Sequence, residues 1–369
     1  MRPTIAEIDL DALSYNYNQM KGIVGKDVAA APVIKADAYG HGAVRVATRL
    51  EKEGADMFIV AFIEEGIELR EAGIKTPILI AGAFLPEDSG HIIRWNLTPI
   101  VFTISQIDAL DSSAKRSDRR IKVHIKVDTG MGRLGLVPED LAGFAGEIMR
   151  RKNIAIEGIM THFAQADIED NEFAIRQLNV FNGALEELRR KGVNPPVIHS
   201  ANSAAIICLK ESHFNMVRPG LMVYGVFPID KKWDISLKPV MSLRSKVVQV
   251  KRIPEGSSVG YGKSFITRRE SLIATIPIGY ADGYSRRLSN SGNVIIRGKK
   301  APVAGNVCMD MTMVDVTAHQ GVCVGDEVIL IGRQGDELIA AEDLARLTGT
   351  IPYEVLSCIG KRVPRVYRG

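Results

Sequence analysis

The sequence has few cysteines, and their spacing predicts neither a metal site nor a disulfide framework. Cys208, Cys308, Cys323 and Cys358 are scattered along 369 residues, with no Cys-x-x-Cys pair. Structural zinc sites and disulfide-rich folds both require closely patterned cysteines. We therefore expect no metal centre and free thiols, which are typical of a cytoplasmic protein.

An excess of charge of one sign and a long apolar run are also missing. The 47 basic and 43 acidic side chains leave a net charge of +4, which gives no basis for binding nucleic acid. No stretch approaches the roughly 20 apolar residues that cross a bilayer. The first ten residues include Glu7 and Asp9 where a signal peptide needs an apolar core, so we expect neither export nor a membrane anchor.

The length and the pattern of apolar runs predict two domains, the first of which is a β/α barrel. A chain of 369 residues is too long for one ordinary core. Stretches of helical period, such as 63–72 and 172–190, separate most of the short apolar runs before residue 225. Eight such runs predict an eight-stranded parallel barrel; they cover 30–36, 57–62, 77–81, 98–102, 121–127, 154–161, 196–199 and 215–217. An open doubly wound sheet is the alternative, but no Gly-x-Gly-x-x-Gly follows the first run.

The rest of the chain predicts a mostly β domain. Alternating runs punctuated by Gly and Pro cover 240–253, 271–278, 293–297, 312–316 and 327–331. A helix is expected over 341–348, followed by a strand-like tail. We place the barrel at 1–236 and the β domain at 237–369, with 4–9 as a candidate strand of the second domain.

Lys35 stands where the first apolar run gives way to glycines. A lysine at the end of a buried strand must be paired or have its pKa lowered. Such a lysine is a candidate for covalent attachment of pyridoxal phosphate (PLP). A lysine whose charge reaches solvent, or one in a salt bridge, is the ordinary alternative.

Other polar residues follow the later runs at the end of the barrel where reacting groups gather. Lys126 and Asp128 close the fifth run, and single residues close the sixth, seventh and eighth: His162, His199 and Arg218. Arg133 lies in a glycine-rich loop, where it suits a carboxylate, a phosphate or a phenolate, although most loop arginines are solvated. The histidines could equally be structural hydrogen-bonding groups, and Tyr261, between two glycines, a packing residue.

Along nearly its whole length the chain resembles the PLP-dependent alanine racemases. The central motif is Val33-Ile-Lys-Ala-Asp-Ala-Tyr-Gly-His-Gly42. The other matching segments, in order, are 6–13, 126–135, 158–163, 201–205, 217–225, 260–262, 277–284, 305–311 and 352–356. Any one of them is a weak signal, whereas the ordered set is highly specific.

The resemblance implies a barrel with a β domain, assembled as a head-to-tail homodimer with shared active sites. Lys35 would hold PLP and act as one base, and Tyr261 of the partner subunit would act as the opposite base. Racemisation requires this arrangement, because one group removes the Cα proton from one face and another returns a proton to the other. The product would supply D-alanine for peptidoglycan.

The resemblance also assigns the residues around the cofactor. Arg218 would face the pyridine nitrogen, and His162 and His199 would complete a hydrogen-bond chain through Arg218 towards Tyr261. Arg133 would hold the phenolate oxygen and the substrate carboxylate, oriented by a carbamate on Lys126. The phosphate would be bound by Tyr39, Ser203, Gly220, Leu221 and Tyr353.

The β domain would contribute to the substrate side. The backbone of Met309 would help to hold the carboxylate, supported by Asp310. The narrow entrance would be lined by Asp167, Tyr280, Arg286, Asp310 and Ile351. Ser285 stands where the family pattern leads us to expect proline, which puts the rigidity of that loop in doubt.

Three alternatives to an alanine racemase remain at this point: two enzymes with other activities and one protein without catalytic activity. A racemase of broader specificity, for instance towards serine, has the same motifs. A related decarboxylase of basic amino acids should carry a glutamate opposite the pyridine nitrogen, and Arg218 argues against it. A non-catalytic PLP carrier made of the barrel alone would not need the β domain with Tyr261 and Tyr353.

Overall fold

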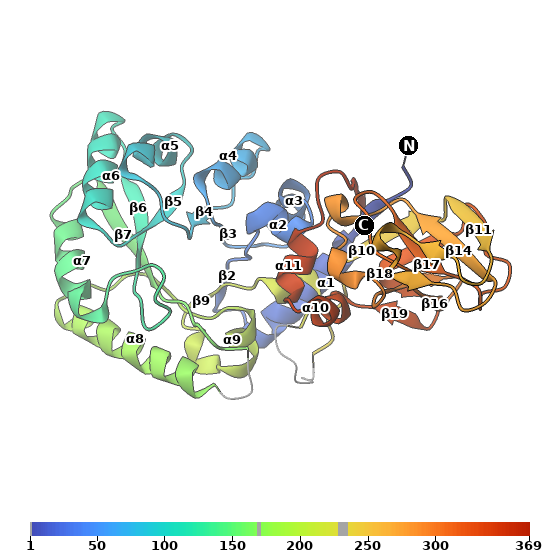
Figure 1. Ribbon diagram of the computed structural model, residues 1–369. Helices are drawn as coiled ribbons and strands as arrows, with labels where there is room; N and C mark the ends of the chain where they lie inside the picture. The colour runs from blue at the N-terminus through green and yellow to red at the C-terminus, as the bar shows by residue number, and fades with distance from the viewer. Residues whose placement is uncertain (1, 168–170, 228–234) are drawn as a thin grey trace. The chain divides into compact units, whose positions relative to one another are not determined.

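A computed structural model of the protein describes residues 2–167, 171–227 and 235–369 (Figure 1). The chain forms two compact units. The barrel unit contains Ser14–Ala38 and Ala43–Leu237, and the β unit contains Met1–Leu13, Tyr39–Gly42 and Lys238–Gly369. Two amino-terminal segments therefore belong to the β unit, and the first of them contains 4–9, the candidate strand of the second domain.

All eight apolar runs form strands of the barrel unit, and the predicted fold is confirmed. The strands are β2 (Ala29–Ala30), β3 (Phe58–Val60), β4 (Ile78–Ile80), β5 (Thr98–Val101), β6 (Ile121–Lys126), β7 (Ile154–Met160), β8 (Val197–His199) and β9 (Met216–Val217). Strands β3 to β8 pair in parallel in sequence order, and β2 pairs in parallel with β9. A parallel bridge between Val33 and Ile59 extends the ladder from β2 to β3.

Helices connect the strands and form an outer ring in Figure 1. They are α1 (Leu10–Val24), α3 (Ala43–Lys52), α4 (Ile63–Glu71), α5 (Ser89–Arg94), α6 (Ile104–Arg116), α7 (Leu141–Met149), α8 (Glu172–Arg190) and α9 (Ser203–Cys208). In α8, Leu178, Phe181 and Leu185 are buried at a spacing of three and four residues, which places them on one helical face. None of the described helices is long and apolar enough to span a membrane.

The β unit contains two main sheets. One has the order β16-β15-β18-β10-β1-β20, with β19 beside β18, and the other has the order β11-β14-β17. Strands at the predicted positions are β1 (Ile5–Asp9), β10 (Met241–Lys246), β11 (Gln249–Ile253), β14 (Ser271–Ile276), β15 (Asn293–Ile296), β17 (Thr312–Asp315), β18 (Glu327–Gln334) and the tail β20 (Arg365–Arg368). The predicted helix is α10 (Ala341–Thr348), whereas β12 (Ser258–Val259), β13 (Phe265–Ile266), β16 (Lys299–Pro302), β19 (Glu337–Ile339) and α11 (Pro352–Ser357) were not predicted.

Segment Tyr39–Gly42 belongs to the β unit because its glycines allow a close approach to the end of the chain. Gly40 and Gly42 have φ of +81° and +94°, which favours glycine. A Cβ on Gly40 would overlap the carbonyl oxygen of Leu356, and one on Gly42 would overlap the hydroxyl of Tyr367. Arg365 Nε donates a 2.9 Å hydrogen bond to the Gly40 carbonyl, which fixes the segment there.

Candidate active site

The structure brings the polar residues that follow the strands to one end of the barrel. Lys126 and His199 are the last residues of β6 and β8. Lys35 follows the bridge at Val33, His162 lies just after β7, and Arg218 comes directly after β9. Because parallel strands end at the same rim, these five side chains share the carboxyl end of the barrel.

Lys35 begins a short helix of opposite hand. In α2 (Lys35–Gly40), the residues Ala36, Asp37, Ala38 and Tyr39 all have φ between +52° and +54°. Non-glycine residues pay roughly 1–2 kcal/mol each for this left-handed conformation. Strained backbone of this kind is concentrated at functional sites, where the surrounding structure holds it.

Two carboxylates and one backbone bond hold the left-handed turn. Glu65 Oε1 accepts a 2.6 Å hydrogen bond from the Ala36 amide. Asp37 Oδ1 accepts a 2.7 Å bond from the Ala43 amide, and the Ala38 amide donates to the Ile34 carbonyl. Glu65 was not among the predicted site residues, because its link to Ala36 spans a strand and is not visible in local sequence patterns.

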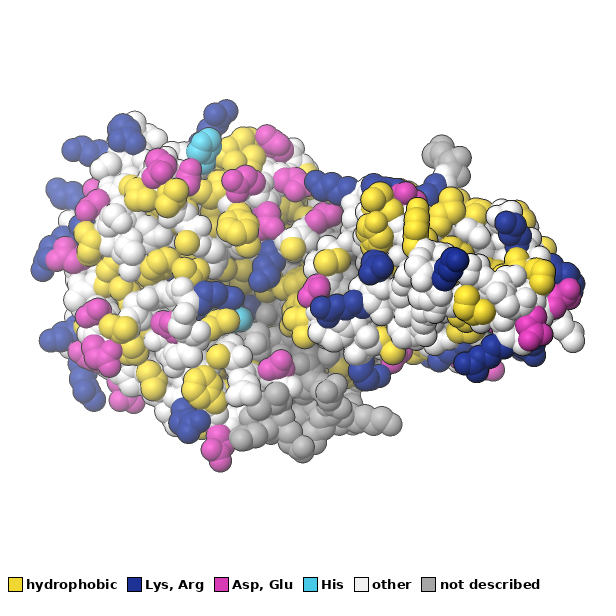
Figure 2. All heavy atoms as spheres, in the orientation of Figure 1, with side chains coloured by type: hydrophobic (Ala, Val, Ile, Leu, Met, Phe, Trp, Pro, Cys, Tyr) yellow, Lys and Arg dark blue, Asp and Glu magenta, His cyan; other side chains and the backbone are white. Residues whose placement is uncertain are grey.

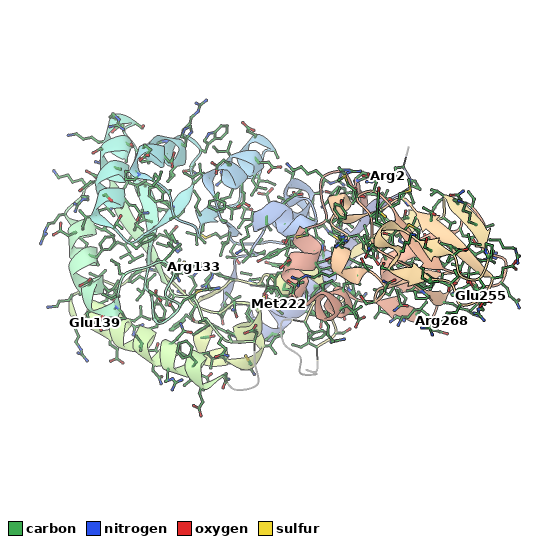
Figure 3. The ribbon with its side chains drawn as sticks, in the orientation of Figure 1. Arg2, Arg133, Glu139, Met222, Glu255 and Arg268 are labelled. Carbon is green, nitrogen blue, oxygen red and sulfur yellow. The ribbon has the colours of Figure 1, made fainter. Side chains whose placement is uncertain are left out.

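The amines at the rim are surrounded by cations. Burial and the charge of Arg133 lower the pKa of Lys35, and Glu65 opposes them. Burial, Arg218 and Arg133 lower the pKa of Lys126 to about 7. Figure 3 shows Arg133 inside the ring formed by the barrel unit. Its loop is held by Asp128 Oδ1, which accepts hydrogen bonds from the amides of Gly130 and Met131.

Arg218 is a buried guanidinium that, among the described residues, donates only to neutral acceptors. Its side chain donates to His199 Nδ1 at 3.1 Å, to His162 Nδ1 at 2.9 Å and to the carbonyls of Thr161 and Ser200 at 2.9 Å. Burial lowers the pKa of Arg218 to about 9. Across the described parts of the chain, no carboxylate forms an ion pair with Arg218 and no atom accepts from its Nε. A donor is therefore left for a ligand.

A line of side chains continues from Arg218 into the barrel. His199 Nε2 lies 2.7 Å from His124 Nδ1, and His124 Nε2 lies 3.4 Å from Glu157 Oε2. His124 and Glu157 were not among the predicted site residues. His124 lies two residues before Lys126 on β6, and residues two apart in a strand face the same side, so this spacing could have indicated it.

Ser203 organises a group of backbone amides near the end of β9. Its Oγ accepts from the amides of Gly220 at 2.8 Å and Met222 at 3.4 Å, and the side chain is buried. Leu221 begins the short helix η4 (Leu221–Tyr224). Amides in a first helical turn have no partner within the helix. The Ser203 hydroxyl and the Leu221 amide can therefore donate to an anion.

In the β unit, two tyrosines lie together and a third is exposed. The ring centroids of Tyr39 and Tyr353 are 5.7 Å apart, with Tyr353 on α11. Tyr261 is 74% exposed, and Gly260 and Gly262 on either side of it both have φ of +72°. Asn306 Nδ2 donates a 2.7 Å hydrogen bond to the Tyr261 carbonyl and so fixes the backbone of this turn.

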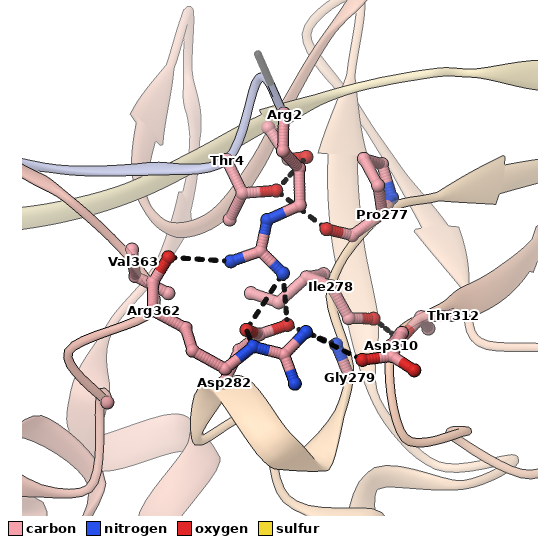
Figure 4. Close-up of polar contacts among 12 residues, drawn as sticks. Arg2, Thr4, Pro277, Ile278, Gly279, Asp282, Asp310, Thr312, Arg362 and Val363 are labelled. Carbon is pink, nitrogen blue, oxygen red and sulfur yellow. Dashed lines mark hydrogen bonds and ion pairs between the residues drawn. The ribbon is translucent and has the colours of Figure 1, made fainter.

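The segment containing Met309 and Asp310 is anchored by an arginine network (Figure 4). The carboxylate of Asp282 is fully buried and accepts from Arg2 Nη1 at 2.8 and 2.9 Å. Arg362 contacts Asp282 at 3.3 Å and donates to Asp310 Oδ1 at 2.6 Å. The Met309 carbonyl accepts from the Ala281 amide at 3.1 Å, which joins this segment to the turn after β14.

The predicted entrance residues are divided between the units. Asp167 is exposed in the barrel unit. Tyr280 and Arg286 line a hollow of about 640 Å³ in the β unit, and Ile351 is exposed beside α11. Among the described residues, no group of His, Cys, Asp and Glu side chains could hold a metal ion.

Comparison with known proteins gives a consistent result. Residues 8–228 match the family model of the alanine racemase N-terminal domain, and residues 240–367 match that of the C-terminal domain. The chain is 47% identical over 368 residues to alanine racemase of Halothermothrix orenii, covering 100% of this chain and 97% of that protein. It is 46% identical over 369 residues to the enzyme of Carboxydothermus hydrogenoformans, with 100% of both covered.

Solved structures show the same similarity. An alanine racemase of Clostridium difficile 630 has a TM-score of 0.95 at 40% identity, covering 99% of this chain and 96% of that one. Alanine racemase from Bacillus anthracis with bound L-Ala-P has a TM-score of 0.95 at 37% identity, covering 100% and 96%.

Proposed function

The chain belongs to the alanine racemase family, and we propose that it interconverts L-alanine and D-alanine using PLP held covalently by Lys35. As a member of this family it is an isomerase. The observation that carries the proposal is the shared rim position of Lys35, with its lowered pKa, and of Arg218, with its neutral partners. Bound to an amino acid, PLP withdraws electrons from Cα and makes the Cα proton removable.

The residues at the rim fit this anionic cofactor. Lys126 repels both Arg133 and Arg218, and an anionic group placed among these cations relieves the repulsion. The Ser203 hydroxyl and the Leu221 amide supply donors for a phosphate, and the Gly220 amide orients that hydroxyl by donating to Ser203 Oγ. We also assign Tyr39 and Tyr353, whose ring centroids lie 5.7 Å apart, to phosphate binding.

Arg218 is suited to hold the ring nitrogen without giving it a proton. A guanidinium has donors only and keeps its charge at neutral pH. Nη1 and Nη2 of Arg218 already donate to protein acceptors, so Nε would donate to the ring nitrogen. Nε would neither gain nor lose a proton in the reaction. This arrangement limits electron withdrawal into the ring, so that return of the proton is favoured over decarboxylation and transamination.

Proton transfer would use two bases. The lowered pKa of Lys35 leaves more of its amine neutral at a given pH, as a base requires. The second base would be Tyr261 of the partner subunit. Its high exposure supports this assignment, because a tyrosine that works on a desolvated substrate must be covered by another surface.

A homodimer would cover apolar surface at the barrel rim. Phe62, Leu85 and Ile104 follow β3, β4 and β5 and are 58%, 60% and 43% exposed. Figure 2 shows hydrophobic side chains exposed on the barrel unit, with Lys, Arg, Asp and Glu mostly around its edge. Exposed apolar surface with a polar periphery is typical of a protein interface. We propose that this rim receives the β unit of the partner.

Lys126 would act on Arg133 after modification. With a pKa of about 7, part of its amine is neutral and can attack carbon dioxide, forming an N–C bond and releasing a proton to water. The resulting carbamate would replace a repulsive cation beside Arg133 with an attractive anion. Arg133 would then be fixed to bind the substrate carboxylate, together with the Met309 backbone.

Racemisation of amino acids tests the function directly. We expect the chain with PLP to racemise L-alanine and D-alanine in an assay by chiral chromatography, and Lys35→Ala to be inactive. L-Serine and L-lysine, assayed in parallel, test a broader racemase and a decarboxylase. Release of carbon dioxide without racemisation would contradict the proposal.

We further propose that the enzyme works in the cytoplasm, where its D-alanine is available for peptidoglycan.

A further inference from the structure

We propose that His124 and Glu157 are positioning residues, with Glu157 as the terminal acceptor of a hydrogen-bond chain that fixes the tautomers of two histidines and thereby holds Arg218. The chain consists of Arg218, His199, His124 and Glu157, joined at 3.1, 2.7 and 3.4 Å. The proposal rests on the proposed function, in which Arg218 contacts the ring nitrogen of PLP.

The chemistry of the two ends determines each proton between them. Arg218 can only donate, so His199 Nδ1 must accept and the proton of a neutral His199 is on Nε2. His199 Nε2–H then donates to His124 Nδ1, which places the His124 proton on Nε2. His124 Nε2–H donates to the Glu157 carboxylate, which can only accept when ionised.

The charges agree with this assignment. Burial lowers the pKa values of His124 and His199, so both rings are neutral at pH 7. Hydrogen bonds from His124 and Lys122 lower the pKa of Glu157 to about 2, although burial opposes them. A cation at Arg218 and an anion at Glu157 are therefore joined by two neutral rings, and every bond is donated toward Glu157.

Such a chain orients groups and does not move protons. Reversing the bonds would require protonation of Glu157 and loss of a proton from Arg218, which removes both charges at once. The fixed direction keeps the His199 Nδ1 lone pair on Arg218 Nη1, while His162 Nδ1 accepts from Nη2. The guanidinium is thus held in one plane, with Nε left for the ligand.

A glycine on strand β7 leaves room for the His124 ring. His124 is fully buried on β6, and Gly158 lies beside it on β7. A Cβ on Gly158 would lie 2.5 Å from His124 Nδ1 and 2.6 Å from its Cε1. Any larger residue would displace the ring that joins His199 to Glu157.

Nitrogen NMR on the full chain tests the tautomers without reference to activity. Histidine labelled with ¹⁵N in a deuterated chain gives long-range correlations that separate Nδ1–H, Nε2–H and charged rings, and the seven histidines keep the spectrum simple. We expect Nε2–H for both His124 and His199, with and without PLP. An Nδ1–H tautomer or a charged ring at either residue would overturn the proposal, even if the chain is a racemase.

Two variants of Glu157 distinguish the loss of its hydrogen-bond acceptor from the loss of its negative charge. Glu157→Gln keeps an acceptor for His124 and should retain kcat within about threefold. Glu157→Leu has no acceptor and should lower kcat about 10–100-fold, as happens when the outer hydrogen-bond partner of a metal ligand is lost, with little change in KM. His124 should keep its proton on Nε2, because His199 still donates to its Nδ1, but that proton then has no acceptor. If Glu157→Leu fails to fold, the tautomers in the wild-type spectrum and the kcat of Glu157→Gln still test the proposal.

Lys122→Ala is the matched control. Lys122 donates to the other carboxylate oxygen of Glu157 at 2.6 Å and is 66% exposed, so the variant keeps the His124 bond. Its tautomers and kcat should equal those of the wild type. Equal kcat for Glu157→Leu and wild type, or equal losses in Glu157→Leu and Glu157→Gln, would contradict the proposal. Absence of racemisation in all chains, with the expected tautomers, would instead contradict only the proposed function.

Discussion

The Glu65 carboxylate accepts a hydrogen bond from the amide of Ala36, the residue directly after Lys35, at 2.6 Å. Its other oxygen accepts from the amides of Ala61 and Phe62 at 2.7 and 3.1 Å, at the end of β3. One side chain therefore joins the left-handed turn to the neighbouring strand. Since that turn is costly for non-glycine residues, Glu65 is a main support of the Lys35 position.

Replacing Glu65 with alanine should loosen the turn that carries Lys35. Three backbone donors would lose a charged acceptor, and a hydrogen bond to a charged group contributes about 1.5–3 kcal/mol. We expect a loss of about that size in the free energy of unfolding, measured in urea. We also expect less PLP to be fixed on Lys35 by borohydride reduction, quantified by peptide mass spectrometry.

Glu64→Ala is the control for this prediction, because Glu64 is an exposed acid on the same helix. It should match the wild type in both measurements. If Glu65→Ala retained wild-type stability and full labelling of Lys35, the carboxylate would not support the turn. Label recovered on a different lysine would refute the assignment of Lys35 itself.

Burial of Lys126 should make stability depend on pH in a defined direction. Its pKa is about 7 in the folded chain and 10.5 in the ordinary state. Between these values the unfolded chain binds the proton and the folded chain does not, so the free energy of unfolding rises with pH. In buffer free of carbon dioxide, Lys126→Met should therefore be more stable than the wild type at pH 7. The difference should shrink towards pH 9.5, by at most about 3 kcal/mol.

Bicarbonate distinguishes the proposed carbamate from an ordinary buried lysine. At pH 8 it should raise the Tm of the wild type and leave that of Lys126→Met unchanged, since the carbamate removes the repulsion from Arg133 and Arg218. Lys191→Met, at the exposed end of α8, controls for loss of a surface charge. If the free energies of unfolding of wild type and Lys126→Met differed by the same amount from pH 7 to pH 9.5, the lowered pKa of Lys126 would be contradicted.

The barrel and the rim could be predicted from sequence because both follow from local patterns. Each buried parallel strand is a short apolar run, and a polar residue at its end, such as Lys126 or His199, is visible in the sequence. The contacts that hold these residues are not local. Glu65 reaches Ala36, and His124 reaches His199, only when neighbouring strands are aligned.

The left-handed turn was unpredictable for a different reason. Ala36, Ala38 and Tyr39 have no intrinsic preference for positive φ, so tertiary contacts impose the conformation. The short strands β12, β13, β16 and β19 have two to four residues, too few for a periodic pattern. The return of residues 39–42 to the β unit likewise depends on Leu356 and Tyr367, more than 300 residues away.

Removing the hydroxyl of Tyr261 should affect the two directions of catalysis unequally. If Lys35 and Tyr261 work on opposite faces of the substrate, each removes the Cα proton of one enantiomer. Tyr261→Phe should then slow exchange of the Cα proton of L-alanine in D₂O far more than that of D-alanine, as followed by proton NMR. Equal slowing of both exchanges would count against opposed bases. Tyr280→Phe, another exposed tyrosine of the β unit, should slow both exchanges to a similar and smaller extent.

Mixed dimers test whether one active site uses two chains. Lys35→Ala and Tyr261→Ala subunits should each be inactive alone, because each lacks one base. In a head-to-tail dimer, a hybrid has one site with both substitutions and one site with neither. Co-expression with two different affinity tags and sequential purification isolates this hybrid, which should recover up to about half of the wild-type kcat. Hybrids that are verified by mass spectrometry and remain inactive would mean that Lys35 and Tyr261 serve a site within one chain. Because Tyr261 is 74% exposed in the single chain, we expect recovery.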